Sequence, residues 1–212
     1  MKDEGLRARE SGAEVTWLGC LSLVFYAVHA GYHVFDGHPE NGLWMCHVAA
    51  VLVGVGLIVR SAALNAVGVL CLLVGLPLWI FDLVGGDRFL PTSLLTHVGA
   101  LAIGLVGIRR LGVPRQVWAK AAAFVGAMHL VARWITPERA NVNLAFAVWP
   151  GWEPYFASHV VYAWTMLATC AFWFYVGEVG LRYVLGQRHA DAAGAGSDVA
   201  MSQDADSECE RG

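Results

Sequence analysis

Long apolar stretches alternate with short polar breaks along most of the chain. Six stretches approach or exceed the about 20 apolar residues that a helix needs to cross the roughly 30 Å hydrocarbon layer of a bilayer. They cover residues 15–35, 43–59, 63–84, 94–108, 117–135 and 156–185. The fourth reaches the lower length limit only if Thr92 and Ser93 begin its first turn. The pattern predicts an all-α, polytopic membrane protein with six transmembrane helices.

The polar breaks divide the chain into three predicted segments. Residues typical of turns fill the breaks, for example at 36–39 and 112–114. Residues 1–14 form a predicted cytoplasmic N-terminal segment, residues 15–188 a six-helix transmembrane domain, and residues 189–212 a tail. The tail is rich in Ala, Gly, Ser and Asp and has no apolar face to bury, so it is predicted to be disordered and cytoplasmic.

The basic residues indicate how the chain is oriented. With six spans, all of the 14 Lys and Arg residues lie on one side except Arg88, Arg133 and Arg139. Because basic residues in short loops favour the cytoplasmic side, both termini are predicted to be cytoplasmic. The expected location is a bacterial cytoplasmic (inner) membrane.

The composition agrees with a membrane protein and excludes one class of partner. Hydrophobic residues make up 57% of the chain and charged residues 15%, whereas a soluble domain carries about 25% charged residues. Mean hydropathy is +0.53. A net charge of -3 excludes the basic patch typical of nucleic-acid binding. Membrane lipids are therefore the expected partners, nucleic acid is not, and protein partners cannot be predicted.

Six histidines fall at a similar depth when the chain is laid out as six helices. At a rise of about 1.5 Å per residue, all lie within about two turns of the predicted outer face. They are His29 and His33 on the first helix, His47, His97 and His159 at the starts of the second, fourth and sixth, and His129 near the end of the fifth. Asp82 on the third helix lies at the same level.

Helical spacing places these polar groups on shared stripes. Tyr26 lies on the stripe of His29 and His33, and Tyr162 lies on that of His159. Because an ionisable group that faces lipid is costly, we expect a polar pocket that opens to the outer face. Interfacial packing of the histidines at headgroup level is the alternative.

Cys46 is the first candidate for chemistry in this pocket. It lies at the histidine level, and a thiol becomes a nucleophile when a base is adjacent. His47 follows it directly, but neighbouring helical residues point about 100° apart. The base is therefore expected on another helix, and His97 is the choice. The hydroxyls of Thr92, Ser93 and Thr96 are candidate donors to a developing oxyanion. Alternatively, Cys46 is a small packing residue.

A metal site is the second candidate. His29 and His33, four residues apart on one helix, present two ligands of the kind that zinc and iron bind. His97, His129, His159 or Asp82 are candidates to complete the site. A single haem held by two histidines from different helices is a further possibility. A binding or structural protein without catalysis stays open as well.

Three motifs resemble those of the YwaF-type bacterial integral membrane proteins. They are LWMCHVA at 43–49, PTSLLTH at 91–97, and the stretch from NVNL to WPGW at 141–152. That family is distantly similar to androgen-induced-type intramembrane lipid hydrolases and to a transmembrane phospholipid acyltransferase. The resemblance implies Cys46 as nucleophile, His97 as base and a lipid acyl ester as substrate. The chain departs from the family at its early helix, where the family reads His-x-Cys and Cys46 here precedes His47.

Overall fold

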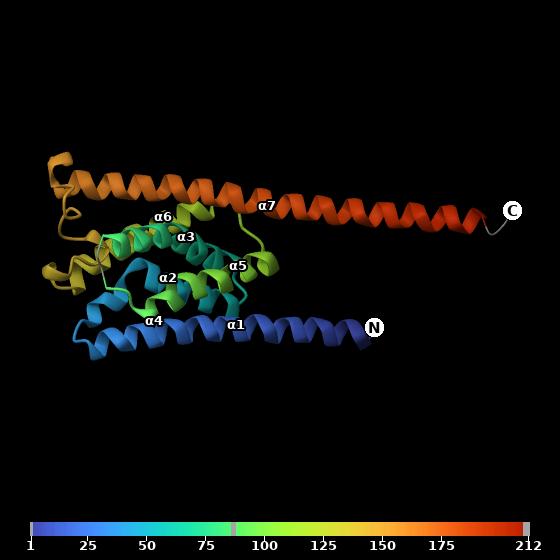
Figure 1. Cartoon of the computed structure of the whole chain (residues 1–212), viewed down its shortest axis with the longest axis horizontal. Helices are drawn as coiled ribbons and strands as arrows, with labels where there is room; N and C mark the ends of the chain where they lie inside the picture. The colour runs from blue at the N-terminus through green and yellow to red at the C-terminus, as the bar shows by residue number, and fades with distance from the viewer. Residues whose placement is uncertain (1, 86–87, 210–212) are drawn as a thin grey trace. The chain divides into compact units, whose positions relative to one another are not determined.

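The computed structural model describes residues 2–85 and 88–209, with side chains for 13–85 and 88–185. Its described elements are all helical, which confirms the all-α prediction (Figure 1). The main helices are α1 Lys2–Phe35, α2 Met45–Ile58, α3 Ala62–Val84, α4 Pro91–Leu94, the π-helix η2 Leu95–Gly99, α5 Ala100–Leu111, α6 Val117–Ile135 and α7 His159–Cys209. Short 3-10 helices are η1 Pro39–Leu43, η3 Glu138–Ala140, η4 Val142–Leu144 and η5 Glu153–Tyr155.

Within the described residues, four helical segments are long and apolar enough to cross a membrane. They are Ala13–Phe35, Ala62–Val84, Pro91–Leu111 and His159–Leu185. The 14 residues of α2 span only about 21 Å at 1.5 Å per residue, less than the hydrocarbon layer. The described part of the chain is thus all helical and includes helices long enough to cross a membrane. That α2 and α6 also cross the membrane, and that both termini are cytoplasmic, remain predictions.

The fourth predicted span is one continuous helix built from α4, η2 and α5. It begins at Pro91, where a proline is well tolerated because the first helical N–H has no partner within the helix. Thr92 and Ser93 therefore lie in its first turn, as the length argument requires. Its middle, Leu95–Gly99, is a π-helix.

Helix α2 packs against both α1 and α3. Small residues permit this close packing: Ala49 and Ala50 of α2 are fully buried. At Gly56, a Cβ atom would lie only 2.5 Å from the backbone nitrogen of Asn65 in α3. Such small-residue contacts are typical of helix packing in membranes.

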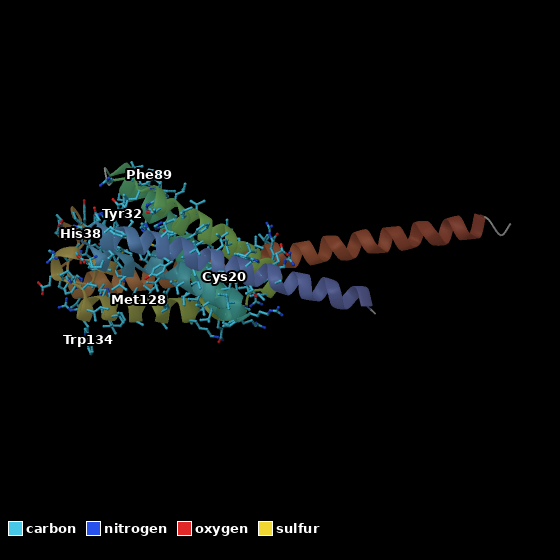
Figure 2. The ribbon with its side chains drawn as sticks, turned by 90° about the horizontal axis from the view of Figure 1, so that it is seen from below. Cys20, Tyr32, His38, Phe89, Met128 and Trp134 are labelled. Carbon is cyan, nitrogen blue, oxygen red and sulfur yellow. The ribbon has the colours of Figure 1, made fainter. Side chains whose placement is uncertain are left out.

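Large apolar side chains remain exposed on the helices. Trp17 of α1, Trp134 of α6 and Trp164 of α7 are 74%, 86% and 68% exposed, and Trp134 points away from the bundle in Figure 2. Exposed apolar surface of this extent indicates an apolar surrounding or partner. It agrees with helices that face lipid.

The chain divides into two compact units, Met1–Glu178 and Val179–Gly212. Every residue of the site described below belongs to the first unit. Helix α7 continues to Cys209, across most of the tail predicted to be disordered. Alanine, frequent in this segment, has the highest helix propensity, which favours a helix here. The segment boundaries and the cytoplasmic placement stay predictions.

Candidate functional site

The candidate site is a cavity of about 760 Å³. Its walls come from α1, α2, α3, α4, η2, α6, the following loop and α7. The predicted residues that line it are His29, His33, Cys46, His47, Asp82, Ser93, His97, His129, His159 and Tyr162. Three predicted pocket residues, Tyr26, Thr92 and Thr96, are not among its lining residues.

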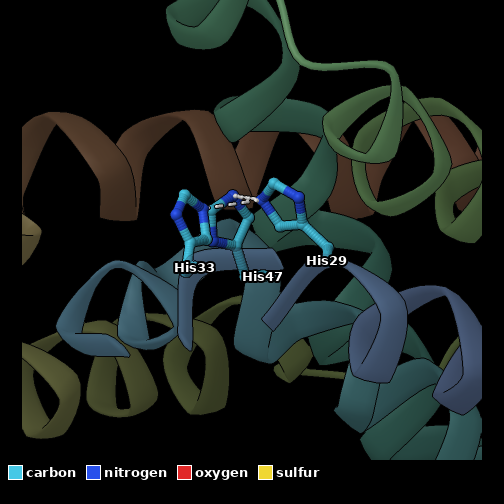
Figure 3. A group of neighbouring side chains, drawn as sticks. All are labelled: His29, His33 and His47. Carbon is cyan, nitrogen blue, oxygen red and sulfur yellow. Dashed lines mark hydrogen bonds between the residues drawn. The ribbon is translucent and has the colours of Figure 1, made fainter. Parts of the chain in front are cut away.

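Three of the histidines converge at one wall of this cavity. His29 and His33 come from α1 and His47 from the first turn of α2, and their rings meet in Figure 3. The Nε2 atom of His29 lies 3.0 Å from Nε2 of His47 and 3.3 Å from Nε2 of His33. All three side chains are buried. We call these residues the histidine triad.

In His47 and His29, the Nδ1 atom contacts a group outside the triad. His47 Nδ1 lies 2.9 Å from the backbone oxygen of Asn41 in η1. Because a carbonyl only accepts, Nδ1 of His47 carries the hydrogen, and Nε2 of the neutral ring therefore offers a lone pair. His29 Nδ1 lies 2.9 Å from the Thr92 hydroxyl. These contacts orient two of the rings with Nε2 toward the centre of the triad.

His97 is oriented by the π-helix in which it lies. Its Nδ1 donates to the Ser93 backbone oxygen at 2.9 Å, and the Thr96 hydroxyl donates to the same oxygen at 3.0 Å. The indole of Trp79 stacks on the imidazole, with ring centroids 4.8 Å apart. The Nε2 atom is buried and has no hydrogen-bond partner within the described part of the chain. Segments of π-helix are frequent at functional sites.

Cys46 lies beside two of these histidines. Its sulfur and one ring nitrogen each of His47 and His97 lie within 4.8 Å of one another. Gly75 of α3 makes room for the cysteine, because a Cβ atom there would lie 3.0 Å from Cys46 Cβ. His97 is the base that the sequence predicts. The structure brings His47 into the same group, although adjacent helical residues were expected to point apart.

The hydroxyls proposed as oxyanion donors have other partners in the structure. Thr92 contacts His29 and Thr96 donates to the Ser93 carbonyl. Ser93 Oγ lies 3.4 Å from His97 Nδ1 and is the only one of the three on the cavity wall. Ser93 is therefore the hydroxyl best placed to face a ligand.

His129 and His159 form a separate pair in the cavity. Their rings stack with centroids 6.0 Å apart. His129 Nδ1 contacts the backbone oxygen of Asn143 at 3.3 Å, and His159 Nε2 contacts that of Leu144 at 2.9 Å. These backbone contacts give the pair a role in holding the loop.

The third member of the group around His29 and His33 is His47. The sequence did not include His47 among the candidates to complete a metal site.

Asn143 fastens the loop over the start of α2. Its side-chain oxygen accepts from the Met45 N–H at 2.6 Å, and its amide donates to the backbone oxygens of Leu43 at 3.0 Å and Met128 at 3.4 Å. Its backbone is left-handed, with φ of 53°, which Asn tolerates better than most residues. Sequence reasoning missed Asn143 as a site residue, although it lies in the 141–152 motif.

Comparisons with protein-family models, with curated proteins and with solved structures give no match. The site is therefore interpreted from its own geometry. That geometry contains two overlapping groups, the histidine triad and the group of Cys46, His47 and His97.

Proposed function

We propose that this chain is a multi-pass protein of a bacterial inner membrane that hydrolyses or transfers acyl groups of membrane lipids. Cys46 is the nucleophile and His97 the general base. The observation that carries the proposal is their proximity: the Cys46 sulfur and a ring nitrogen of His97 lie within 4.8 Å at the cavity wall. A nucleophile beside an oriented base is the arrangement that covalent catalysis needs.

The surroundings of His97 suit a base. Because its Nδ1–H is bonded to the Ser93 carbonyl, the lone pair that accepts a proton is on Nε2. That atom is buried and has no partner among the described residues. The Ser93 carbonyl and the Trp79 ring fix the imidazole plane, as a third group orients the base in catalytic triads.

The cavity suits a lipid acyl chain. Apolar side chains from three helices line it, including Leu78 of α3, Val125 of α6 and Leu167 of α7. Its volume of about 760 Å³ lies in the range of ligand pockets, about 300–1,000 Å³. A mostly apolar pocket with polar groups beside Cys46 holds an acyl chain and leaves the ester beside the thiol.

In the proposed reaction, His97 Nε2 takes the proton of the Cys46 thiol. The sulfur forms a bond to the acyl carbonyl carbon, the ester C–O bond breaks, and the leaving alcohol takes the proton from His97. Water then attacks the thioester while His97 accepts its proton, the C–S bond breaks, and the thiol is reprotonated. A second lipid hydroxyl in place of water gives acyl transfer.

The motifs at 43–49, 91–97 and 141–152 support the same proposal through their resemblance to the YwaF-type family. Six spans with cytoplasmic termini complete it, supported by the distribution of Lys and Arg. The order Cys46-His47 departs from that family's His-x-Cys.

Trapping the thioester tests the proposal. The full chain, purified in detergent, is incubated with an alkyne-bearing activated ester of a long-chain fatty acid and then treated with neutral hydroxylamine, which cleaves thioesters. We expect a hydroxylamine-sensitive label that disappears in Cys46→Ala. His97→Ala is expected to acquire it about 10²- to 10⁴-fold more slowly, the usual contribution of a general base.

Cys170→Ala is the matched control, because Cys170 also lines the cavity but is outside the group of Cys46, His47 and His97. It is expected to label like the unmodified chain. Equal labelling of Cys46→Ala and the unmodified chain would refute the nucleophile. Equal rates with and without the His97 imidazole would refute the base.

A further inference from the structure

We propose that the histidine triad binds one divalent transition-metal ion, with zinc the best fit, through the Nε2 atoms of His29, His33 and His47. Metal binding goes beyond the acyl chemistry and does not depend on it. The two groups share only His47, so each can be tested while the other is intact.

The spacing of His29 Nε2 from Nε2 of His47 and of His33 is that of ligands around one metal. With a Zn–N distance of about 2.05 Å, two ligands at the tetrahedral angle lie about 3.3 Å apart. The measured Nε2–Nε2 distances are 3.0 and 3.3 Å. They correspond to N–Zn–N angles of about 94° and about 107° for that bond length. One ring nitrogen of each histidine lies within 4.8 Å of one ring nitrogen of each of the other two.

The hydrogens available to the triad do not satisfy these contacts. Nε2 of His47 offers only a lone pair, since its Nδ1–H is donated to Asn41. A single Nε2–H on His29 would then face two neighbouring nitrogens, His47 and His33. Without that hydrogen, His33 Nε2 can donate to His29, but the lone pairs of His29 and His47 still face each other. A cation at the centre converts these opposed lone pairs into ligands.

The partners outside the triad also fit a metal site. In metal-bound histidines the N–H of the second ring nitrogen usually donates to a carbonyl, a carboxylate or another polar group, and this hydrogen bond fixes the orientation of the ring. The Asn41 carbonyl does so for His47 and the Thr92 hydroxyl for His29. These two contacts come from η1 and α4, so the ligands are held in place by elements other than their own helices.

The site leaves one coordination position free for a ligand from the cavity. All three histidines line the cavity, and three protein ligands with one open position are typical of catalytic rather than structural zinc. Water fits this position. If the proposed acyl chemistry holds, the carbonyl oxygen of a bound ester is the second occupant, polarised by the metal as a Lewis acid.

Metal binding is measured on the full chain in detergent, stripped with a chelator and titrated with Zn²⁺ and with Co²⁺. We expect one equivalent of either metal and an intense visible Co²⁺ spectrum of tetrahedral coordination. His29→Ala, His33→Ala and His47→Ala are each expected to weaken binding by more than about 10- to 100-fold, the loss that removal of an outer partner causes. Thr92→Val, which removes such a partner, is expected to fall within that range.

His159→Ala is the matched control, since it removes a cavity histidine outside the triad, and it is expected to bind normally. Whether the chain binds one equivalent of metal is measured on the unmodified chain, so a variant that fails to fold leaves that result intact. Less than stoichiometric binding would overturn the site. A sulfur-to-cobalt charge-transfer band would overturn the assigned ligands, because it requires a cysteine ligand. Metal binding without acyl labelling would leave this inference standing and remove only the acyl chemistry.

Discussion

Replacing Asn143 should loosen the loop that lies over the cavity. Two of its hydrogen bonds are short, from the Met45 N–H at 2.6 Å and to the Leu43 carbonyl at 3.0 Å. At about 0.5–1.5 kcal/mol each, they contribute about 1–3 kcal/mol. Its left-handed backbone, with φ of 53°, adds about 1–2 kcal/mol for a residue such as alanine.

Asn143→Ala is therefore expected to lower the free energy of unfolding by about 2–5 kcal/mol. Asn143→Gly should cost about 1 kcal/mol less, because glycine adopts positive φ freely. Tryptophan fluorescence during unfolding in mixed micelles measures both variants. Arg139→Ala is the control from the same loop, since its contact with Glu40 is 4.0 Å long and the arginine is 76% exposed. If both Asn143 variants stay within about 0.5 kcal/mol of the unmodified chain, the role assigned to Asn143 in holding the loop is wrong.

Two further predictions concern helix ends and helix packing, and the same unfolding measurement checks both. Glu178 accepts two backbone N–H groups at the start of α6, each at 3.0 Å, so Glu178→Gln is expected to cost about 1–3 kcal/mol. Glu14→Gln breaks the ion pair with Arg110, whose glutamate side chain is 56% exposed, and should cost less than about 1 kcal/mol. Equal losses of stability in the two variants would contradict the role of Glu178 as a buried acceptor at the start of α6. Gly56→Ala places a Cβ against the α3 backbone and is expected to cost about 1–3 kcal/mol. Gly31→Ala in α1 meets no atom within 4 Å and is expected to stabilise by about 0.5–1 kcal/mol; a matching loss would show that space is not the cause.

The positions of the helices could be predicted because bilayer thickness sets a length that hydropathy reveals. The apolar stretch 63–84 corresponds to α3 at Ala62–Val84, and Pro91 marks the start of the next helix as its sequence suggests. Whether α2 crosses a membrane could not be predicted in the same way, because its 14 residues leave its depth to its packing partners.

The composition of the site was only partly predictable. The similar depth of Cys46 and His97 along their helices was enough to predict that they form one site, because residues at the same level of a helix bundle can meet. Rotation of each helix about its axis depends on packing, which the pattern does not encode. For that reason the sequence did not reveal that His47 turns to His29, or that Trp79 stacks on His97.

The π-helical turn at Leu95–Gly99 has a consequence for how this protein would be compared with others. A π turn accommodates one residue more than an α turn at nearly the same total rotation, so losing a single codon there would restore an ordinary helix and redirect the side chains within the turn, while the flanking halves would keep nearly the same relative orientation. His97, which lies inside the turn, would then face a different direction relative to Ser93. A relative could keep every named side chain and still lack the arrangement, so gaps in this stretch carry more information than identities.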